Sequence, residues 1–182
     1  EQKNVYIDLG KAEAILAPSE QIPGELYRHG DRLKTYIIEV KKTTKGPQIL
    51  VSRTHPGLLK RLFELEVPEI HDGIVEIKAV AREPGLRSKI SVHSRDENVD
   101  PVGACVGHKG MRVQTIVNEL KGEKIDIVKW NTDPTKYIAN ALSPAKVVSV
   151  EVNEVEKTSR VVVPDYQLSL AIGKEGQNAR LA

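Results

Sequence analysis

Two short loops bracketed by glycine constrain this chain more than any other feature. The first loop occupies residues 107–110 (Gly-His-Lys-Gly) and the second loop residues 173–176 (Gly-Lys-Glu-Gly), so their first glycines lie 66 positions apart (173 minus 107). Each loop follows a short apolar run and leads into a segment that can be helical. Because the same pattern recurs in matching contexts, it indicates a duplicated structural module.

Glycine suits such a loop for a steric reason. It allows a sharp bend and lets a phosphate lie against main-chain N–H groups without a Cβ in the way, and the following helix adds its partly positive N-terminus. A Gly-x-x-Gly loop between two helices is the clamp of a KH domain, which grips the backbone of about four nucleotides. A single loop would be read as an ordinary helix-to-helix turn, so the prediction depends on the repetition.

The flanking patterns repeat as well. Residues 56–67 have apolar side chains at helical spacing, including Leu65, and a hairpin is expected over 73–81 and 86–94, with Val75, Ile77 and Ala79 on one face. The rest of the first copy is expected as a helix capped by Asp100 with Pro101 at its first position, a helix after the loop that stops at Gly122, and a strand over 125–130.

The second copy predicts a helix over 135–141, strands over 146–152 and 159–163, and a helix over 166–172. Helix–strand–strand–helix–loop–helix–strand is the order of the bacterial KH fold.

The first 54 residues have a different pattern, typical of short strands. Candidate strands at residues 4–9, 12–16, 33–40 and 49–52 are divided by Gly and Pro turns, which suggests a small barrel. Tyr6, Tyr27 and Tyr36 are the aromatic residues of this part. If they are core residues, the barrel is a poor surface for stacking bases.

Composition excludes several classes of function. A net charge of only +2 means that affinity for RNA must come from local placement of charge. No apolar run approaches the roughly 20 residues that cross a membrane, and the single Cys105 excludes an intrachain disulfide, which fits a cytoplasmic protein. The histidines have no zinc-site spacing. We therefore expect no metal site, no cofactor and no catalytic residues.

Four longer runs resemble one family. Residues 100–107 and 119–128 resemble the first KH domain of the NusA family of bacterial transcription factors, and residues 140–145 and 168–182 resemble its second KH domain. The first 54 residues look like the later strands of the family's S-one domain, an OB-type barrel. The resemblance implies a mixed fold: a partial all-β OB-type barrel (1–54), an α+β KH domain of the bacterial type (55–131) and a second, truncated KH domain (132–182).

The resemblance also implies a function. Members of this family bind nascent single-stranded RNA and modulate RNA polymerase pausing, termination and antitermination, so RNA polymerase and other antitermination factors are the implied protein partners. The chain would then be a fragment without the polymerase-binding domain and the start of the barrel. Two alternatives stay open: the RNA-binding module of an RNA-processing enzyme, and a ribosome-associated KH protein.

The predicted RNA contacts lie in and just after the two loops. They are Gly107, His108, Lys109, Gly110, Arg112, Gly173, Lys174, Glu175, Gly176, Gln177, Asn178 and Arg180. Lys109, Arg112 and Lys174 would supply phosphate charge, unless they are ordinary solvated surface charges, while Gln177, Asn178 and Arg180 would reach sugars or base edges. Glu175 departs from an ideal clamp because a carboxylate repels phosphate, although it suits the first turn of a helix. Trp130 is expected to pack at the junction of the KH modules.

Overall fold

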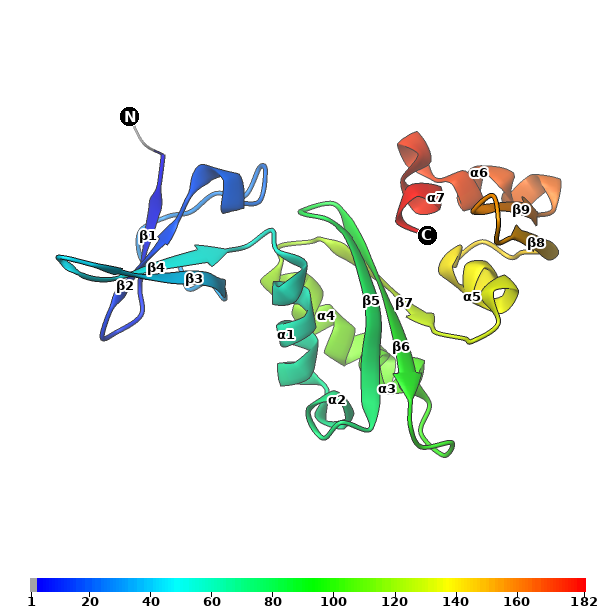
Figure 1. Cartoon of the computed structure of the whole chain (residues 1–182), viewed down its shortest axis with the longest axis horizontal. Coiled ribbons are helices and arrows are strands. Elements are labelled where there is room, and N and C mark those ends of the chain that lie inside the picture. The colour runs from blue at the N-terminus through cyan, green and yellow to red at the C-terminus, as the bar shows by residue number, and fades with distance from the viewer. Residues whose placement is uncertain (1–2) are drawn as a thin grey trace.

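The structure is a computed structural model that describes residues 3–182. These residues form an N-terminal sheet followed by two units of mixed helix and strand, arranged one after another along the long axis (Figure 1). The mixed fold class is confirmed. Among the described residues, no helix has the length and apolar character needed to cross a membrane.

The N-terminal sheet contains every strand predicted before residue 54. Its strands are β1 (Val5–Asp8), β2 (Glu13–Leu16), β3 (Tyr36–Thr43) and β4 (Gly46–Ser52), in the spatial order β1-β2-β4-β3. A short 3-10 turn, η1 (Pro18–Glu20), follows β2. Ala14, Leu16 and Val51 are fully buried and form a small core of their own.

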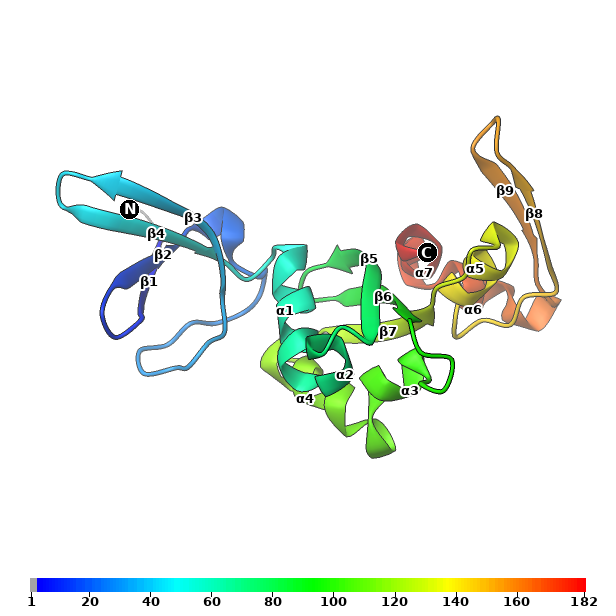
Figure 2. The ribbon, with the colours of Figure 1, turned by 60° about the horizontal axis from the view of Figure 1, so that its bottom comes forward.

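The middle unit places four helices on one face of a three-stranded sheet (Figure 2). Its elements are α1 (Pro56–Glu66), α2 (Pro68–His71), β5 (Val75–Glu83), β6 (Arg87–Ser94), α3 (Pro101–Val106), η2 (His108–Gly110), α4 (Met111–Glu119) and β7 (Lys124–Lys129). Strand β6 pairs antiparallel with β5 but parallel with β7. Because parallel neighbours need a crossover connection, the chain between β6 and β7 must cross a face of the sheet. The first loop lies on that crossover, between α3 and α4.

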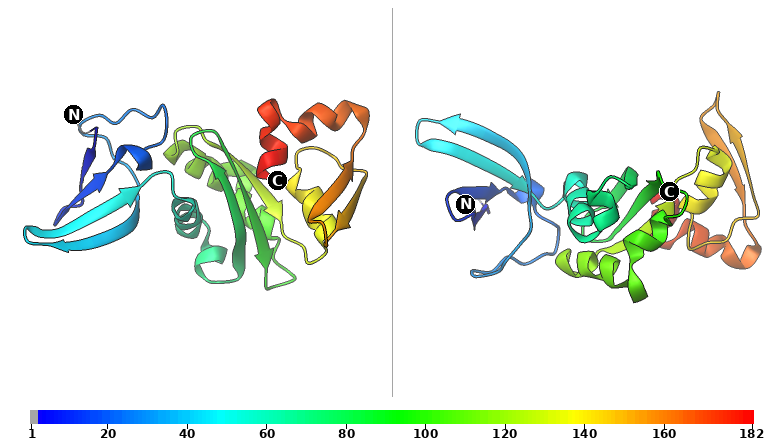
Figure 3. Two further views of the ribbon diagram at one scale, coloured as in Figure 1. Left: turned by 45° about the horizontal axis from the view of Figure 1, so that its top comes forward. Right: turned by 90° about the horizontal axis from the view of Figure 1, so that it is seen from below.

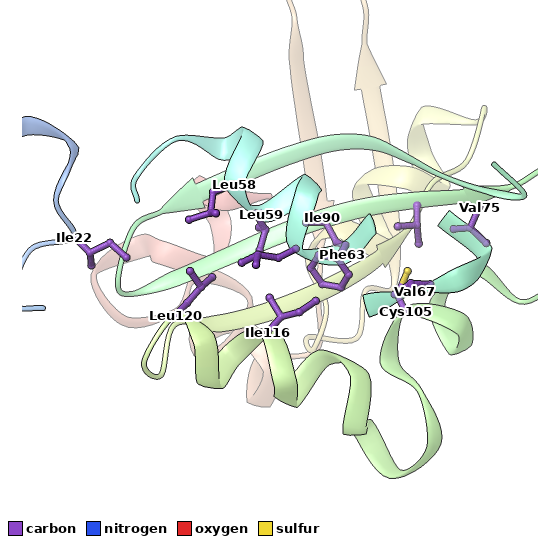
Figure 4. Close-up of a cluster of buried hydrophobic side chains, with 12 residues drawn as sticks. Ile22, Leu58, Leu59, Phe63, Val67, Val75, Ile90, Cys105, Ile116 and Leu120 are labelled. Carbon is purple, nitrogen blue, oxygen red and sulfur yellow. The ribbon is translucent and has the colours of Figure 1, made fainter. Parts of the chain in front are cut away.

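One large core holds this unit together. Leu58, Leu59, Leu62 and Phe63 of α1 are buried against residues from β5, β6, α3 and α4 (Figure 4). Ile22, from the loop after β2, joins the same cluster. Leu65 does not belong to the buried face of α1, since it is 72% exposed.

The prediction that Val75, Ile77 and Ala79 share one face of β5 is wrong for Ala79. A register shift between Ile77 and Ala79 interrupts the pairing with β6. The alternation of side chains therefore slips by one residue at this bulge. Val80 packs on the core in place of Ala79, which is exposed.

The last unit repeats the plan of the middle unit up to its second loop. Its elements are α5 (Pro134–Ala141), β8 (Ser149–Asn153), β9 (Thr158–Val162), η3 (Asp165–Gln167), α6 (Leu168–Ile172), η4 (Lys174–Gly176) and α7 (Gln177–Leu181). Strands β8 and β9 form an antiparallel pair. Helix α5 begins as α3 does, with an aspartate cap before proline: Asp133 accepts from Thr135 N (3.0 Å), and Asp100 accepts from Val102 N (3.1 Å).

Buried polar contacts join the three parts, which stay in line in two further views (Figure 3). Arg53, at the end of the N-terminal sheet, is fully buried and its guanidinium meets Glu25 Oε1 (2.8 Å) and Glu119 Oε1 of α4 (3.1 Å). On the other side, Lys89 Nζ of β6 donates to Ser143 O (2.7 Å). The connection from β7 to α5 is short, so it holds the two mixed units close together.

Candidate nucleic-acid interface

The two loops have the same backbone conformation. The first glycine has φ 78° and ψ 174° in one loop and φ 79° and ψ 170° in the other. The third residue, Lys109 or Glu175, is left-handed in both (φ 52° and 55°), and so is the final glycine (φ 74° and 73°). Agreement within a few degrees at each of these positions shows that both sequences build one local structure.

The two glycines of each loop meet different demands. Gly107 and Gly173 adopt a combination of φ and ψ that is essentially reserved for glycine. A Cβ there would also come within 2.6 Å of Arg112 Cγ in the first loop and 2.7 Å of Asn178 N in the second. A Cβ at Gly110 or Gly176 would meet no atom within 4 Å, so the surface at these positions is bare backbone. That bare surface is where a phosphate could approach the main chain.

The side chains of the middle residues of both loops are exposed to solvent. His108 and Lys109 are exposed in the first loop, and Lys174 and Glu175 are exposed in the second. Each loop therefore offers one lysine beside accessible backbone. The first loop has the more favourable charge for a phosphate, because the second carries a carboxylate at the matching left-handed position.

The structure contradicts the predicted role of Asn178. Its side chain is only 3% exposed, and Nδ2 donates to Leu142 O (3.0 Å) and Ala171 O (2.9 Å). The amide is therefore used inside the unit, where it ties α7 to α6 and to the end of α5. A residue in this position does not reach a sugar or a base edge.

Arg112 occupies the matching position of the first loop and is also engaged internally. Its Nη1 donates to Ala104 O of α3 (2.7 Å) and pairs with Glu69 Oε2 of α2 (2.9 Å). In both loops, the residue five positions after the first glycine thus bonds to a carbonyl of the preceding helix. Arg112 was predicted as a phosphate contact, but the structure pairs its guanidinium with a carboxylate of the same unit.

Arg180 and Gln177 follow the second loop. The guanidinium of Arg180 pairs with Glu83 Oε1 (2.6 Å), which lies in the middle unit, while Gln177 is half-buried at the start of α7. Sequence reasoning did not identify Glu69 or Glu83 as partners. No local pattern could have done so for Glu83, because it lies 97 positions from Arg180.

Cys105 lies behind the first loop, in α3. Burial raises the pKa of its thiol to about 12, and the nearby Glu69 carboxylate adds to the shift. The thiol is therefore neutral at physiological pH and packs as a small core residue. Within residues 3–182, His, Cys, Asp and Glu side chains form no group of three or more that could hold a metal ion.

The aromatic residues mostly serve packing. Trp130 contacts the rings of His93 (5.1 Å between centroids) and Tyr137 of α5 (6.4 Å), which places it at the junction of the two mixed units, as expected. Lys78 Nζ lies 4.7 Å from the centre of the Trp130 ring. Tyr36 stacks on His55 (4.8 Å), whereas Tyr6 is 58% exposed.

Comparison with known proteins agrees with this geometry. Residues 53–130 match the model of the NusA-like first KH domain, and residues 134–182 match that of the NusA-like second KH domain. Each match contains one of the two loops together with the helices that flank it.

Curated relatives match almost the whole chain. A protein of Halalkalibacterium halodurans is 75% identical over 98% of the chain and 47% of its own length, and one of Bacillus subtilis is 69% identical over 100% and 49%. A protein of Thermus thermophilus is 56% identical over 98% of the chain and 46% of its own length. All three are named transcription termination/antitermination protein NusA. The chain spans about half the length of these relatives and belongs to the NusA family.

Proposed function

We propose that this chain is the RNA-binding region of a NusA-type transcription factor. It contacts nascent single-stranded RNA and so modulates RNA polymerase pausing, termination and antitermination. One observation carries the proposal: two loops with the same glycine-dependent backbone stand in two consecutive NusA-like KH domains. RNA polymerase and other antitermination factors are the protein partners in this proposal.

The mechanism is binding without catalysis. Gly107, Gly110, Gly173 and Gly176 admit the RNA backbone, and exposed charge beside them, from Lys109 and Lys174, attracts phosphate. His108 and Gln177 complete the contact set as polar neighbours. Glu175, in the left-handed position, is exposed to solvent. The phosphate therefore binds beside the glycines of that loop and away from the Glu175 carboxylate.

Two linked clamps bind more strongly than one. Once the first loop holds a strand, capture by the second becomes intramolecular, and avidity rises by about 10²–10⁴ when both can engage together. The three units proposed from the sequence, residues 1–54, 55–131 and 132–182, serve this purpose by holding the loops in place. Buried contacts across both boundaries support that role.

A salt titration of binding to short single-stranded RNA tests the proposal. One variant combines His108→Asp with Lys109→Asp, and the other combines Lys174→Asp with Glu175→Asp. Aspartate tolerates the left-handed conformation of the third loop residue better than most side chains, so these changes alter charge with little backbone strain. We expect each variant to bind more weakly and to show a shallower dependence of log affinity on log salt, because phosphate contacts are lost.

Lys60→Asp supplies the control. Lys60 is an exposed residue of α1, and its substitution changes the net charge by the same amount as the second loop variant. If the control weakens binding as much as the loop variants do, the effect comes from total charge and the clamps are not the site. If neither loop variant changes affinity while the fold is retained, the loops are only turns.

A further inference from the structure

The side chain of Arg180 connects the second loop to the middle unit. We propose that Arg180 is a positioning residue that holds the second clamp at a fixed place relative to the first KH domain, and that it does not contact RNA. This inference rests on the proposed function, since it concerns how the two clamps share one RNA strand. It replaces the expectation that Arg180 reaches sugars or bases.

The guanidinium of Arg180 joins three parts of the chain. Nε and Nη2 both donate to Glu83 Oε1 (3.1 and 2.6 Å), and Nη1 donates to Glu175 O (3.1 Å). Glu175 is the left-handed residue of the second loop, and Glu83 is the last residue of β5. Helix α7, the loop and the first KH domain therefore meet at one planar group, whose several fixed donors suit this role.

Glu83 depends on this contact. Its side chain is 27% exposed, and its second carboxylate oxygen, Oε2, is buried with no hydrogen-bond partner among residues 3–182. A partly buried carboxylate with an unpartnered oxygen is stabilised by a cation beside it. The pair therefore favours the arrangement in which α7 lies against the end of β5.

Among residues 3–182, the first loop has no equivalent attachment. Gln114 occupies the matching position, 66 residues before Arg180. Its Nε2 donates to Asn118 Oδ1 (2.8 Å) within the same helix, α4. The two clamps thus have the same backbone conformation but differ at this position. Of the two side chains, only Arg180 contacts the other KH domain.

Other contacts hold the opposite side of the second KH domain. The Tyr137 hydroxyl donates to Ser91 Oγ (2.6 Å), and Asn140 Nδ2 donates to Lys129 O (3.0 Å). Both come from α5, near the connection to β7. The pair at α7 lies away from that connection, so it opposes a rotation of the second domain about it.

Fixed clamps make the length of the RNA matter. A strand long enough to reach both loops gains from a defined separation, because the effective concentration of the second site is greatest when the linker matches the span. A strand that occupies one loop gains nothing. Breaking the pair between Arg180 and Glu83 should therefore weaken only the binding of RNA that is long enough to reach both loops.

The test measures binding of single-stranded RNA oligonucleotides of increasing length, starting from about four nucleotides, the footprint of one clamp. Glu83→Gln and Arg180→Gln are each expected to lower affinity for the longer oligonucleotides by about two- to fivefold, the scale of a partly exposed ion pair. Affinity for the shortest oligonucleotide and the salt slope should not change. The exchanged pair, Glu83→Arg with Arg180→Glu, should restore most of the loss, and Gln114→Ala should have no effect at any length.

A second measurement does not involve RNA. Spin labels at Glu97→Cys and Glu156→Cys, exposed positions in the two KH domains, report the distance between the domains, and the buried Cys105 does not compete for labelling. We expect the distance distribution to broaden in Glu83→Gln and Arg180→Gln and to narrow again in the exchanged pair. If the chain bound no RNA, the proposed function would fail, but this distance would still test whether Arg180 positions the second domain.

Two outcomes would overturn the inference. In the first, Arg180→Gln lowers the affinity for the shortest oligonucleotide and makes the dependence of log affinity on log salt shallower, while Glu83→Gln raises the affinity. That result is expected if Arg180 contacts phosphate. The second is an unchanged distance distribution in both single variants.

Discussion

At the scale of single residues, the two glycines of each loop are not equivalent. Gly107 has a conformation that other residues do not adopt, and a Cβ there would strike Arg112. Gly110 is left-handed and has free space around it. The Gly-x-x-Gly pattern therefore combines one glycine required by the fold with one that leaves the backbone open to a ligand.

Gly107→Ala and Gly110→Ala should consequently differ in stability. We expect Gly107→Ala to store about 1–3 kcal/mol of backbone strain and also to displace Arg112 from its bond to Ala104 O. Gly110→Ala should cost about 1–2 kcal/mol, the ordinary penalty of a left-handed residue. Denaturant unfolding of both variants measures the difference.

Asparagine provides the control for this comparison, because it enters the left-handed region more readily than alanine. Gly110→Asn should recover part of the loss, and Gly107→Asn should not, because its ψ lies outside that region. Equal losses at both positions would contradict the assignment.

At the scale of elements, the parallel pairing of β6 with β7 is reinforced by charge. Asp126 of β7 accepts from Arg87 (2.8 and 2.9 Å) and from Lys89 (3.0 Å), both in β6. Burial acts to raise the pKa of Asp126, but the hydrogen bonds from Arg87 and Lys89 outweigh it and leave that pKa below its usual value. Burial also lowers the pKa of Lys89, and Asp126 opposes that shift.

The depressed pKa of Asp126 gives a direction for the effect of pH. A carboxyl group that loses its proton more easily in the folded state stabilises the fold above its unfolded pKa, about 3.9, and the contribution disappears as pH falls through the folded pKa. Asp126→Asn should therefore lower the free energy of unfolding at pH 7 by about 1.5–3 kcal/mol. The difference in free energy of unfolding between this variant and the unmodified chain should shrink as pH falls below about 4. Unfolding measured between pH 7 and pH 3 would refute this if the gap stayed constant.

At the scale of the whole molecule, buried ions connect the N-terminal sheet to the first KH domain. Arg53 also donates to Lys34 O (2.9 Å) and Glu119 O (3.0 Å), so its guanidinium is bonded on several sides. Within the first KH domain, Arg82 and Glu123 form a second buried pair, and Arg82 Nη1 donates to His55 O (3.0 Å) at the start of α1. The contacts of Arg53 with Glu119 hold the sheet against the end of the first KH domain.

Arg53→Ala should separate the sheet from its neighbour. It would leave Glu25, which is 2% exposed, without its cation, and removing one partner of a buried pair costs about 3–5 kcal/mol. We expect a large fall in the unfolding midpoint and faster protease cleavage between residues 30 and 56. Arg61→Ala is the control, since that arginine is 65% exposed and pairs only at the surface. Similar behaviour of the two variants would show that Arg53 does not join the domains.

Much of the fold was predictable because its signals are local. Glycine pairs located the loops, the sequence Asp100-Pro101 located the start of α3, and apolar spacing located nearly all strands. The bulge in β5 was not predictable, because nothing in Val75 to Val80 marks the residue that slips. The long-range contacts of Arg112, Asn178 and Arg180 were equally hidden, since Glu69, Leu142 and Glu83 lie 43, 36 and 97 positions away from them.

The sequence by itself determined the family, the order of the elements and the two glycine loops, because each of these depends on residues close together in the chain. Tertiary structure decided which of the neighbouring polar side chains remain available to RNA. Lys109 and Lys174 stay exposed, whereas Asn178 is buried and the two arginines are paired with carboxylates. The physical reason is that a charged or amide group near a packed surface bonds to the acceptors that folding brings beside it, and for each of these three side chains one such acceptor comes from a distant part of the sequence.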